Sequence, residues 1–206
     1  MADTKKEGFV SVDIYFDYLC PYVYRAAVWL ETVKEEIGHK LTVNWRYFSL
    51  EQVNSEQGAK WKIWKQPGNY PSRGLWAFRA AEAARRQGEA FFDSLHLVLL
   101  KATHEQGRDI ADINILIELA RGIGLDIGQF QKDINSRGVL ARLAKDHTVA
   151  VETLGVFGTP TLVFPGEKPV FLKIVAPPPP SDSLDVFDEI RRISEHMQYI
   201  TEIKRP

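Results

Sequence analysis

The side chain best suited to covalent chemistry in this sequence is the thiol of Cys20, the one cysteine among 206 residues. An apolar, β-prone run over residues 9–16 precedes it, and Pro21 follows it. Proline suits the first turn of a helix because its missing N–H would have no partner there. The sequence therefore predicts that Cys20 stands at the N-terminus of a helix over residues 21–37, which ends at Gly38. Unpaired backbone N–H groups and the helix dipole at that end favour a negative charge, and so favour the nucleophilic thiolate.

A lone cysteine is more often an inert, buried side chain than a reactive one. The position of Cys20, between a polar turn and a helix, favours the reactive interpretation. Two neighbouring side chains bear on its chemistry. Asp17 either caps the turn or tunes the thiol, and Tyr22 is expected to face the mouth of the site, where it donates a hydrogen bond or simply packs.

The elements around Cys20 are predicted from the hydrophobic pattern. Residues 41–48 alternate apolar with polar side chains, as a strand does. With the strand over 9–16 and the helix over 21–37 they form a βαβ unit, whose strands are expected to be parallel and whose crossover is expected to be right-handed. From residue 50 to about residue 154 the pattern is helical almost throughout, with helices expected over residues 74–87, 89–102, 112–122, 127–135 and 138–154.

A second motif, Gly158-Thr159-Pro160-Thr161, opens an apolar run that ends at Phe164 and is expected to form a strand. Another strand, over residues 170–175, is expected to pair with it antiparallel after the Pro165-Gly166 turn. This part of the chain therefore adds a hairpin to the sheet.

The C-terminal part begins with four prolines over residues 177–180, which predict an extended linker because proline fits neither a helix interior nor a central strand. Ser181-Asp182-Ser183 then caps a last helix over residues 184–200. This helix is expected to pack back on the sheet.

The stretch Asp17-Tyr18-Leu19-Cys20-Pro21-Tyr22-Val23, taken with the Thr159-Pro160 motif, resembles the active-site turn of the DsbA-like branch of the thioredoxin fold. That branch includes FrnE-type oxidoreductases, the glutathione-dependent 2-hydroxychromene-2-carboxylate isomerases and the kappa-class glutathione transferases. The resemblance implies an α/β protein, a thioredoxin-like fold with an inserted all-helical domain. Residues 1–50 and 155–206 would form the thioredoxin-like domain, and residues 51–154 the helical insertion.

The resemblance also assigns roles to residues. Cys20 would be the catalytic nucleophile, and Pro21, Tyr22, Thr159 and Pro160 would bind substrate. The Thr159–Pro160 peptide bond is expected to be cis, a state that only proline allows at low cost. This proline would pack beside the cysteine turn and leave the backbone of Thr159 free to pair with an extended thiol peptide by strand addition.

The chain departs from the family pattern Cys-Pro-x-Cys at Val23, which stands in place of the second cysteine. A dithiol site passes a disulfide between its own two sulfurs, and Val23 removes that route. The first hypothesis is therefore a single-cysteine thiol oxidoreductase that exchanges disulfides with an external thiol-containing peptide or small molecule. No tightly bound cofactor is expected, and glutathione is the simplest external thiol.

Two alternatives stay open. One is a glutathione-dependent isomerase or transferase on small aromatic substrates, in which Cys20 binds glutathione without changing redox state. Against it, that branch carries a Trp-Gly-x-Asp-Arg segment after the Thr-Pro strand, and Phe164-Pro165-Gly166-Glu167-Lys168 stands there instead. The other alternative, from a different class, is a non-catalytic thioredoxin-fold binding module that keeps the peptide groove.

A basic and aromatic segment, Lys60-Trp61-Lys62-Ile63-Trp64-Lys65 with Tyr70, Arg73 and Trp76, is the second place where chemistry could lie. Such interleaving can bind single-stranded nucleic acid, but the chain is not basic overall. A lid or pocket wall for a hydrophobic or anionic substrate is favoured over nucleic-acid binding, and a plain helical turn that runs from the surface to the core is favoured over both. If glutathione binds, Lys62, Lys65 or Arg73 could pair with its carboxylates.

Composition excludes several other classes. The 26 basic and 27 acidic side chains leave a net charge of −1, which favours neither nucleic acid nor an anionic membrane as partner. No apolar run is long enough to span a bilayer, and the polar residues 1–8 lack the core of a signal peptide, so a cytoplasmic protein is expected. The five histidines lack metal-ligand spacing; no metal is expected, and each is predicted to be solvated or half-buried. A homodimer is left open.

Overall fold

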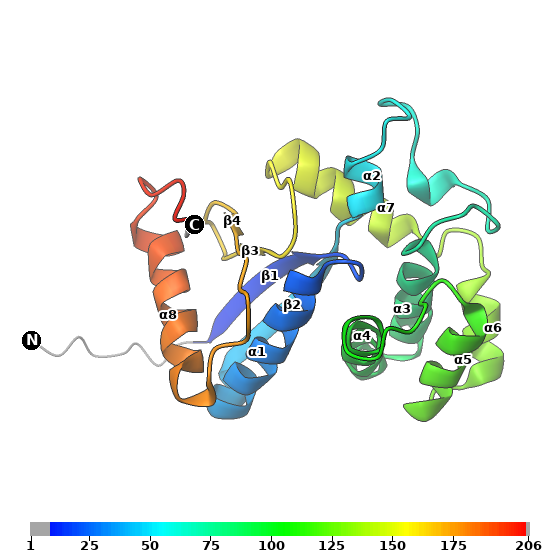
Figure 1. Cartoon of the computed structure of the whole chain (residues 1–206), viewed down its shortest axis with the longest axis horizontal. Helices are drawn as coiled ribbons and strands as arrows, with labels where there is room; N and C mark the ends of the chain where they lie inside the picture. The colour runs from blue at the N-terminus through cyan, green and yellow to red at the C-terminus, as the bar shows by residue number, and fades with distance from the viewer. Residues whose placement is uncertain (1–8, 205–206) are drawn as a thin grey trace, which may run out of the picture.

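The computed structural model describes residues 9–204 and contains a mixed four-stranded sheet (Figure 1). Its strands are β1 (Val10–Phe16), β2 (Leu41–Tyr47), β3 (Thr161–Val163) and β4 (Val170–Phe171). The spatial order is β2-β1-β3-β4, in which β1 and β2 are parallel and the other two pairs are antiparallel. The polar stretch at residues 1–8 lies outside the described residues, as do residues 205–206.

Helix α1 (Pro21–Ile37) connects the two parallel strands, as predicted. It begins at a proline and ends at Gly38, whose φ of +58° lies in the left-handed region that favours glycine. The N–H of Gly38 donates to the carbonyl of Lys34, which satisfies one of the last free carbonyls of the helix. The βαβ unit thus brings Cys20 to the junction of β1 and α1.

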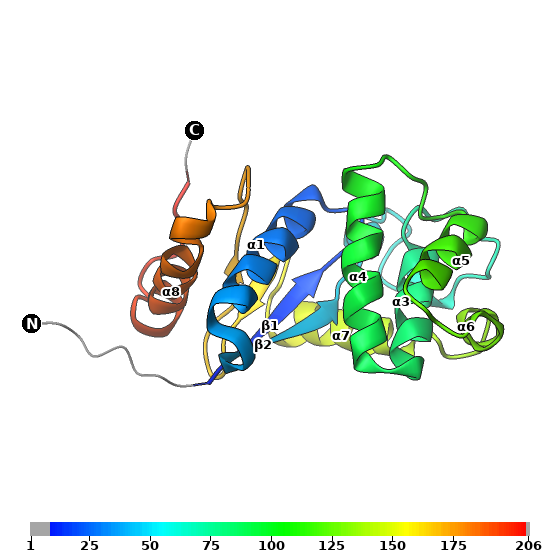
Figure 2. The same cartoon turned by 90° about the horizontal axis from the view of Figure 1, so that it is seen from below.

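Helix α8 corrects the prediction for the C-terminus. It spans Pro180–His196 instead of residues 184–200, because proline is tolerated in the first turn of a helix. The predicted serine caps therefore lie inside the first turn, where the buried Ser183 hydroxyl donates to the Pro179 carbonyl at 3.1 Å. The indole N–H of Trp29 donates to the Ser183 carbonyl at 3.0 Å, and this bond holds α8 beside α1 (Figure 2).

The segment between β2 and β3 is mainly helical and gathers beside the sheet, away from α8 (Figure 1). The predicted helices are confirmed to within a few residues, except at the two ends of the segment. The helices are α2 (Leu50–Val53), α3 (Leu75–Gln87), α4 (Glu89–His104), α5 (Ile113–Gly122), α6 (Ile127–Ile134) and α7 (Ala141–Thr148).

Three stretches contain less regular structure than the sequence predicts. Residues 54–74 form a loop with one 3₁₀ turn, since Pro67 and Pro71 lack the N–H that a helix interior needs. The helix expected over residues 138–154 is α7 followed by a π-helical turn, Val149–Thr153, in which the Leu154 N–H donates to the Val149 carbonyl. The strand expected over residues 170–175 is the two-residue β4.

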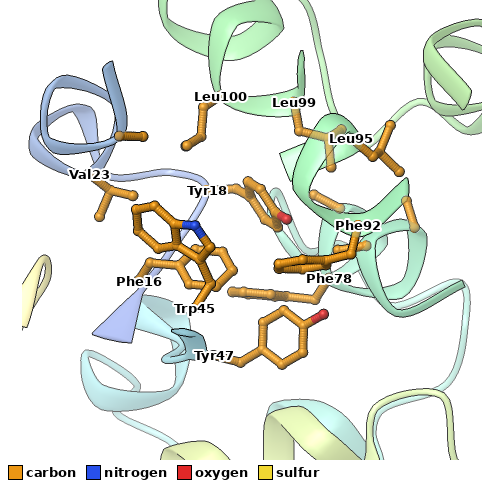
Figure 3. Close-up of a cluster of buried hydrophobic side chains, with 14 of the residues drawn as sticks. Phe16, Tyr18, Val23, Trp45, Tyr47, Phe78, Phe92, Leu95, Leu99 and Leu100 are labelled. Atoms are coloured by element: carbon orange, nitrogen blue, oxygen red, sulfur yellow. The ribbon is translucent and has the colours of Figure 1, made fainter. Parts of the chain in front are cut away.

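The hydrophobic core runs continuously from the sheet into the helical segment (Figure 3). Phe16 at the end of β1 is fully buried, and its ring lies 6.2 Å from that of Phe78 on α3 and 5.6 Å from that of Trp45 on β2. Leu95 and Leu99 on α4 complete the same cluster. The helical segment therefore positions the cysteine turn through this shared core. The predicted domain boundaries, which assign residues 51–154 to a helical insertion domain, stay a prediction.

Candidate active site at the start of α1

Cys20 is the N-cap residue of α1, as the sequence predicts. Its N–H donates to the Asp17 carbonyl at 3.1 Å, and its own carbonyl accepts from the Val23 N–H at 3.1 Å. The side chain is 5% exposed and makes no cap bond to the helix. The thiol is therefore held at the helix N-terminus by backbone bonds on both sides, with its sulfur free to interact elsewhere.

That sulfur meets the second predicted motif. Cys20 Sγ donates to the carbonyl of Thr159 at 3.2 Å, across 139 residues of sequence. The Thr159–Pro160 peptide bond is cis, as predicted, and both residues are buried. The structure thus brings Cys20, Thr159 and Pro160 together, while Pro21 lies exposed in the first turn of α1.

Gly158, just before this pair, is tightly enclosed. A Cβ at Gly158 would lie 3.1 Å from the Phe171 ring on β4, closer than side chains normally approach. The Thr161 hydroxyl donates to the Gly158 carbonyl at 2.8 Å, and the Leu172 N–H donates to the Pro160 carbonyl at 3.0 Å. These contacts fix the loop that carries Thr159 against the sheet.

Asp17 organises the other side of the cysteine turn. It is buried, and its two carboxyl oxygens accept from the Leu19 N–H at 2.8 Å and from the Leu50 N–H at 2.7 Å. Burial raises the pKa of Asp17 from 3.8 to about 7, against the two backbone hydrogen bonds, which favour the ionised form. Asp17 therefore joins the cysteine turn to the start of α2, which favours the capping role over direct contact with the thiol.

Three tyrosines surround the turn and differ in environment. Tyr18 points into the core (Figure 3), where its hydroxyl lies 3.2 Å from Nδ1 of His96. Tyr22 is half-buried, and its ring centre lies 5.3 Å from the Arg25 guanidinium carbon and 5.2 Å from the Lys173 ammonium. The Tyr24 hydroxyl donates to Glu105. Tyr22 is thus the tyrosine placed among cations, a feature that the sequence did not show.

Val23 occupies the position of the family's second cysteine. It is fully buried on the inner face of α1, in the same apolar cluster as Cys20. Because Cys20 is the single cysteine in the sequence, the chain holds no partner for an internal disulfide.

The cationic residues predicted to meet glutathione make other contacts. Lys62 stacks over Trp64 at 5.7 Å, and the Arg73 backbone N–H donates to Glu51. Within residues 9–204, no hydrogen bond or ion pair joins Lys62, Lys65 or Arg73 to the cysteine turn. The structure offers Arg25 and Lys173 in their place, and no sequence pattern pointed to those two.

Two histidines contradict the prediction that all are solvated or half-buried, since His96 and His147 are both buried. Nδ1 of His147 accepts from the Ser49 N–H at 3.1 Å, and burial lowers the pKa of this imidazole to about 4, so that it is neutral at pH 7. The neighbouring Asp146 carboxylate accepts from the Tyr47 N–H at 3.2 Å. These side chains fasten α7 to the end of β2, about 100 residues away in sequence, which no local pattern reveals.

Among residues 9–204, no group of three histidine, cysteine or acidic side chains is arranged to hold a metal ion. The helices of that same range include none that is both long and apolar enough to cross a membrane.

Comparison with known proteins identifies the class of this fold and site. A family model described as a DSBA-like thioredoxin domain matches residues 11–189, and the chain belongs to that family. The chain is 26% identical over 196 residues to Rv2286c, an uncharacterised protein of Mycobacterium tuberculosis, an alignment that covers 95% of this chain and 82% of that protein.

Two solved structures show the same architecture. A thioredoxin-like oxidoreductase from Silicibacter pomeroyi DSS-3 is 25% identical, with a TM-score of 0.55 over 90% of this chain and 88% of that chain. A 2-hydroxychromene-2-carboxylate isomerase is 21% identical, with a TM-score of 0.62 over 89% of this chain and 95% of that chain. The thioredoxin-like fold predicted from the cysteine turn is therefore confirmed, and the two named activities are those of the relatives.

Proposed function

We propose that this chain is a single-cysteine thiol-disulfide oxidoreductase that acts on disulfides formed with glutathione. The observation that carries the proposal is the contact of Cys20 Sγ with the Thr159 carbonyl, next to Pro160 and at the N-terminus of α1. A helix N-terminus stabilises a thiolate, and the thiolate is the form that attacks a disulfide.

The reaction takes two exchange steps. The Cys20 thiolate attacks the glutathione sulfur of a mixed disulfide, that S–S bond breaks, and the substrate thiolate leaves and takes a proton from water. Cys20 is then bonded to glutathione. A second glutathione thiolate attacks the glutathione sulfur of this adduct, which releases glutathione disulfide and restores the Cys20 thiolate. The net reaction exchanges one disulfide for another: the substrate sulfur gains one electron and leaves as a thiol, and the sulfur of the second glutathione loses one. The first glutathione sulfur stays at the disulfide level throughout.

The surroundings of Cys20 favour an external resolving thiol. Val23 stands where a second sulfur would open the mixed disulfide from inside, and the sequence has no other cysteine. Because the adduct persists until glutathione arrives, the mechanism needs a steady supply of reduced thiol. We therefore place the protein in the cytoplasm, where such a supply exists.

The Thr159 carbonyl has a role in binding. In the resting protein it accepts the hydrogen bond of the Cys20 thiol. Ionisation of the thiol removes that donor and frees the carbonyl for a backbone N–H of the substrate, as in strand addition. Both events involve the Thr159 carbonyl oxygen. Formation of the thiolate therefore favours substrate binding, and substrate binding favours the thiolate.

Two positively charged side chains near Tyr22 support the proposal that the substrate carries carboxylates. The Arg25 guanidinium and the Lys173 ammonium both lie close to the Tyr22 ring, and neither has a carboxylate partner among residues 9–204. Leu172, the neighbour of Lys173, donates to the Pro160 carbonyl and so ties this cation to the site. Glutathione carries two carboxylates that can pair with such cations.

The test is to trap the adduct and then measure turnover. The protein is mixed with glutathione disulfide, quenched with acid and examined by intact mass spectrometry. Reduction of the mixed disulfide of glutathione and 2-mercaptoethanol is then followed in a glutathione reductase-coupled assay. We expect one glutathione on Cys20 and catalysed turnover. A folded protein that forms no adduct, although the unfolded protein does, would refute the proposal.

Val23→Cys is the matched variant for this assay. A second sulfur at this position would attack the Cys20 adduct from within, so we expect the trapped adduct to disappear and an internal disulfide between Cys20 and the introduced sulfur to replace it. Val23→Ala is the control that removes the side chain without adding sulfur. If Val23→Cys keeps the full adduct, the geometry of the turn does not support dithiol exchange.

A further inference from the structure

A concave site lies in the helical segment, apart from the cysteine turn. It has a volume of about 620 Å³, within the range of roughly 300–1,000 Å³ that is usual for small-molecule sites. We call it the Trp76 pocket; its lining includes Trp64, Lys65, Trp76, Arg79 and Arg137. These residues come from the 3₁₀ turn at Ile63–Lys65, from α3 and from the connection between α6 and α7. None of the residues proposed to act with Cys20 lines this pocket.

The charge of this pocket is one-sided. Its lining contains three cations, Lys65, Arg79 and Arg137, and no acidic residue. No salt bridge within residues 9–204 engages any of these three side chains, in contrast to Arg86 nearby, which pairs with Asp133 at 3.0 Å. Cations that converge on a concave surface without carboxylates complement a negatively charged ligand.

Arg79 gives the strongest evidence that the pocket binds an anion. Its Nη1 donates to the Ile134 carbonyl at a long 3.4 Å, while its Nε is buried and has no hydrogen-bond partner. Burial lowers the pKa of this guanidinium, because nothing around it compensates for the lost hydration. A partly desolvated cation without a counter-ion is costly, and an anionic ligand in the pocket would offset that cost.

Two indole rings add a preference for a flat ligand. Trp64 and Trp76 are both half-buried in the lining, and the Arg79 guanidinium carbon lies 5.4 Å from the centre of the Trp76 ring. Aromatic faces bind planar rings by stacking, while a guanidinium grips a carboxylate with two parallel N–H donors. We infer that the Trp76 pocket binds a small aromatic molecule that carries a carboxylate. This inference does not depend on the proposed function of Cys20.

The experiment uses the full chain and 2-naphthoate as the probe, measured by isothermal titration calorimetry. Naphthalene-2-methanol has the same rings without the charge, and acetate has the charge without the rings. We expect 2-naphthoate to bind roughly tenfold or more tightly than either control, since each lacks one half of the recognition. Equal binding of 2-naphthoate and the neutral alcohol, or no binding of 2-naphthoate at millimolar concentration, would overturn the inference.

Variants locate the bound probe. Lys65→Gln combined with Arg137→Gln removes two exposed cations of the pocket, so we expect the fold to be kept and the affinity for 2-naphthoate to fall by roughly tenfold. Arg121→Gln combined with Lys168→Gln makes the same change of charge at sites outside the lining and should leave the affinity unchanged. Equal losses in both double variants would show that net charge alone attracts the probe, and would refute a built site.

A spectroscopic readout tests the location without relying on a loss of affinity. The five tryptophans give separate indole N–H signals in a ¹⁵N spectrum, and Trp64→Phe and Trp76→Phe assign the two that matter. We expect 2-naphthoate to shift those two signals most, both in the native protein and after alkylation of Cys20. Loss of the shifts on alkylation would place the probe at the cysteine site and overturn the inference.

Discussion

The cysteine site and the Trp76 pocket are built in opposite ways. The hydrogen bonds of Cys20 are all to backbone groups: those of its own backbone stay within the turn and the first turn of α1, and its sulfur bonds to the carbonyl of the distant Thr159. The lining of the Trp76 pocket instead presents two indole rings and three cations without salt bridges, and it contains no cysteine. The two proposed roles match this difference: covalent chemistry needs one precisely positioned atom, whereas recognition of a ligand needs charges and rings spread over a surface.

Replacing the reacting atom gives the largest expected effect. Cys20→Ser removes the only sulfur that can form a mixed disulfide, so we expect exchange activity to fall by roughly 10³-fold or more. The same variant should bind 2-naphthoate as tightly as the native protein if the two sites are independent. A Cys20→Ser variant that still turns over a small aromatic substrate with glutathione would support the isomerase or transferase alternative instead.

The pH dependence of the unfolding free energy tests the raised pKa of Asp17. Its pKa is raised in the folded protein, so its contribution to stability is complete below about pH 4 and is lost as the pH rises to about 7. In Asp17→Asn this position no longer titrates. We therefore expect the native protein to lose up to about 4 kcal/mol of unfolding free energy, relative to the variant, between those two pH values.

Urea unfolding of both proteins at several pH values measures this difference. The buried acids that titrate in both proteins, such as Asp146, cancel in the comparison. A difference that stays flat with pH would mean that Asp17 has the same pKa in the folded and the unfolded protein, and would contradict the raised pKa.

Tyr18 tests how firmly the cysteine turn is anchored in the core. Tyr18→Phe leaves Nδ1 of His96 without a partner, and Nε2 of the same ring already has none. We expect a loss of about 1–3 kcal/mol of unfolding free energy, the usual cost of an unsatisfied buried polar group. Tyr24→Phe is the control, because its hydroxyl bonds to the exposed Glu105, and we expect a change within about 0.5 kcal/mol. Equal losses from the two variants would contradict the anchoring role.

The cations beside Tyr22 give the smallest expected effect. Arg25→Gln combined with Lys173→Gln should slow formation of the Cys20 adduct from glutathione disulfide by roughly tenfold, because the carboxylates lose their partners. Formation of the adduct from the uncharged disulfide of 2-mercaptoethanol is the internal control and should not change. If both adducts form more slowly by the same factor, the two cations support the fold and do not recognise charge.

Much of the cysteine site could be predicted from the sequence. The strand before Cys20, the proline after it and Gly38 at the end of α1 are local signals, and each matches the structure. The Thr159-Pro160 motif was recognised by its likeness to a family, and the structure shows this pair beside the thiol. Prolines also misled the prediction, since Pro180 begins α8 where a linker was expected.

Only part of the Trp76 pocket could be predicted from the sequence. For the segment around Trp64 and Lys65 a pocket wall was one interpretation, and an ordinary helical turn was the favoured one. Arg79 on α3 and Arg137 between α6 and α7 complete the pocket, and only the fold brings them to this segment. His96 and His147 illustrate the same limit, because their burial depends on packing against β2 and the cysteine turn.

Proline, glycine and hydrophobic periodicity act over a few neighbouring residues, and they were enough to predict the strand, the turn and the helix start around Cys20. The family was recognised from the likeness of this turn and of the Thr159-Pro160 motif to known proteins. Which groups face the Cys20 sulfur, and which cations lack a partner, depends on the tertiary structure. The contact of Cys20 with Thr159 joins segments 139 residues apart, and it arises from burial and packing that no local pattern encodes.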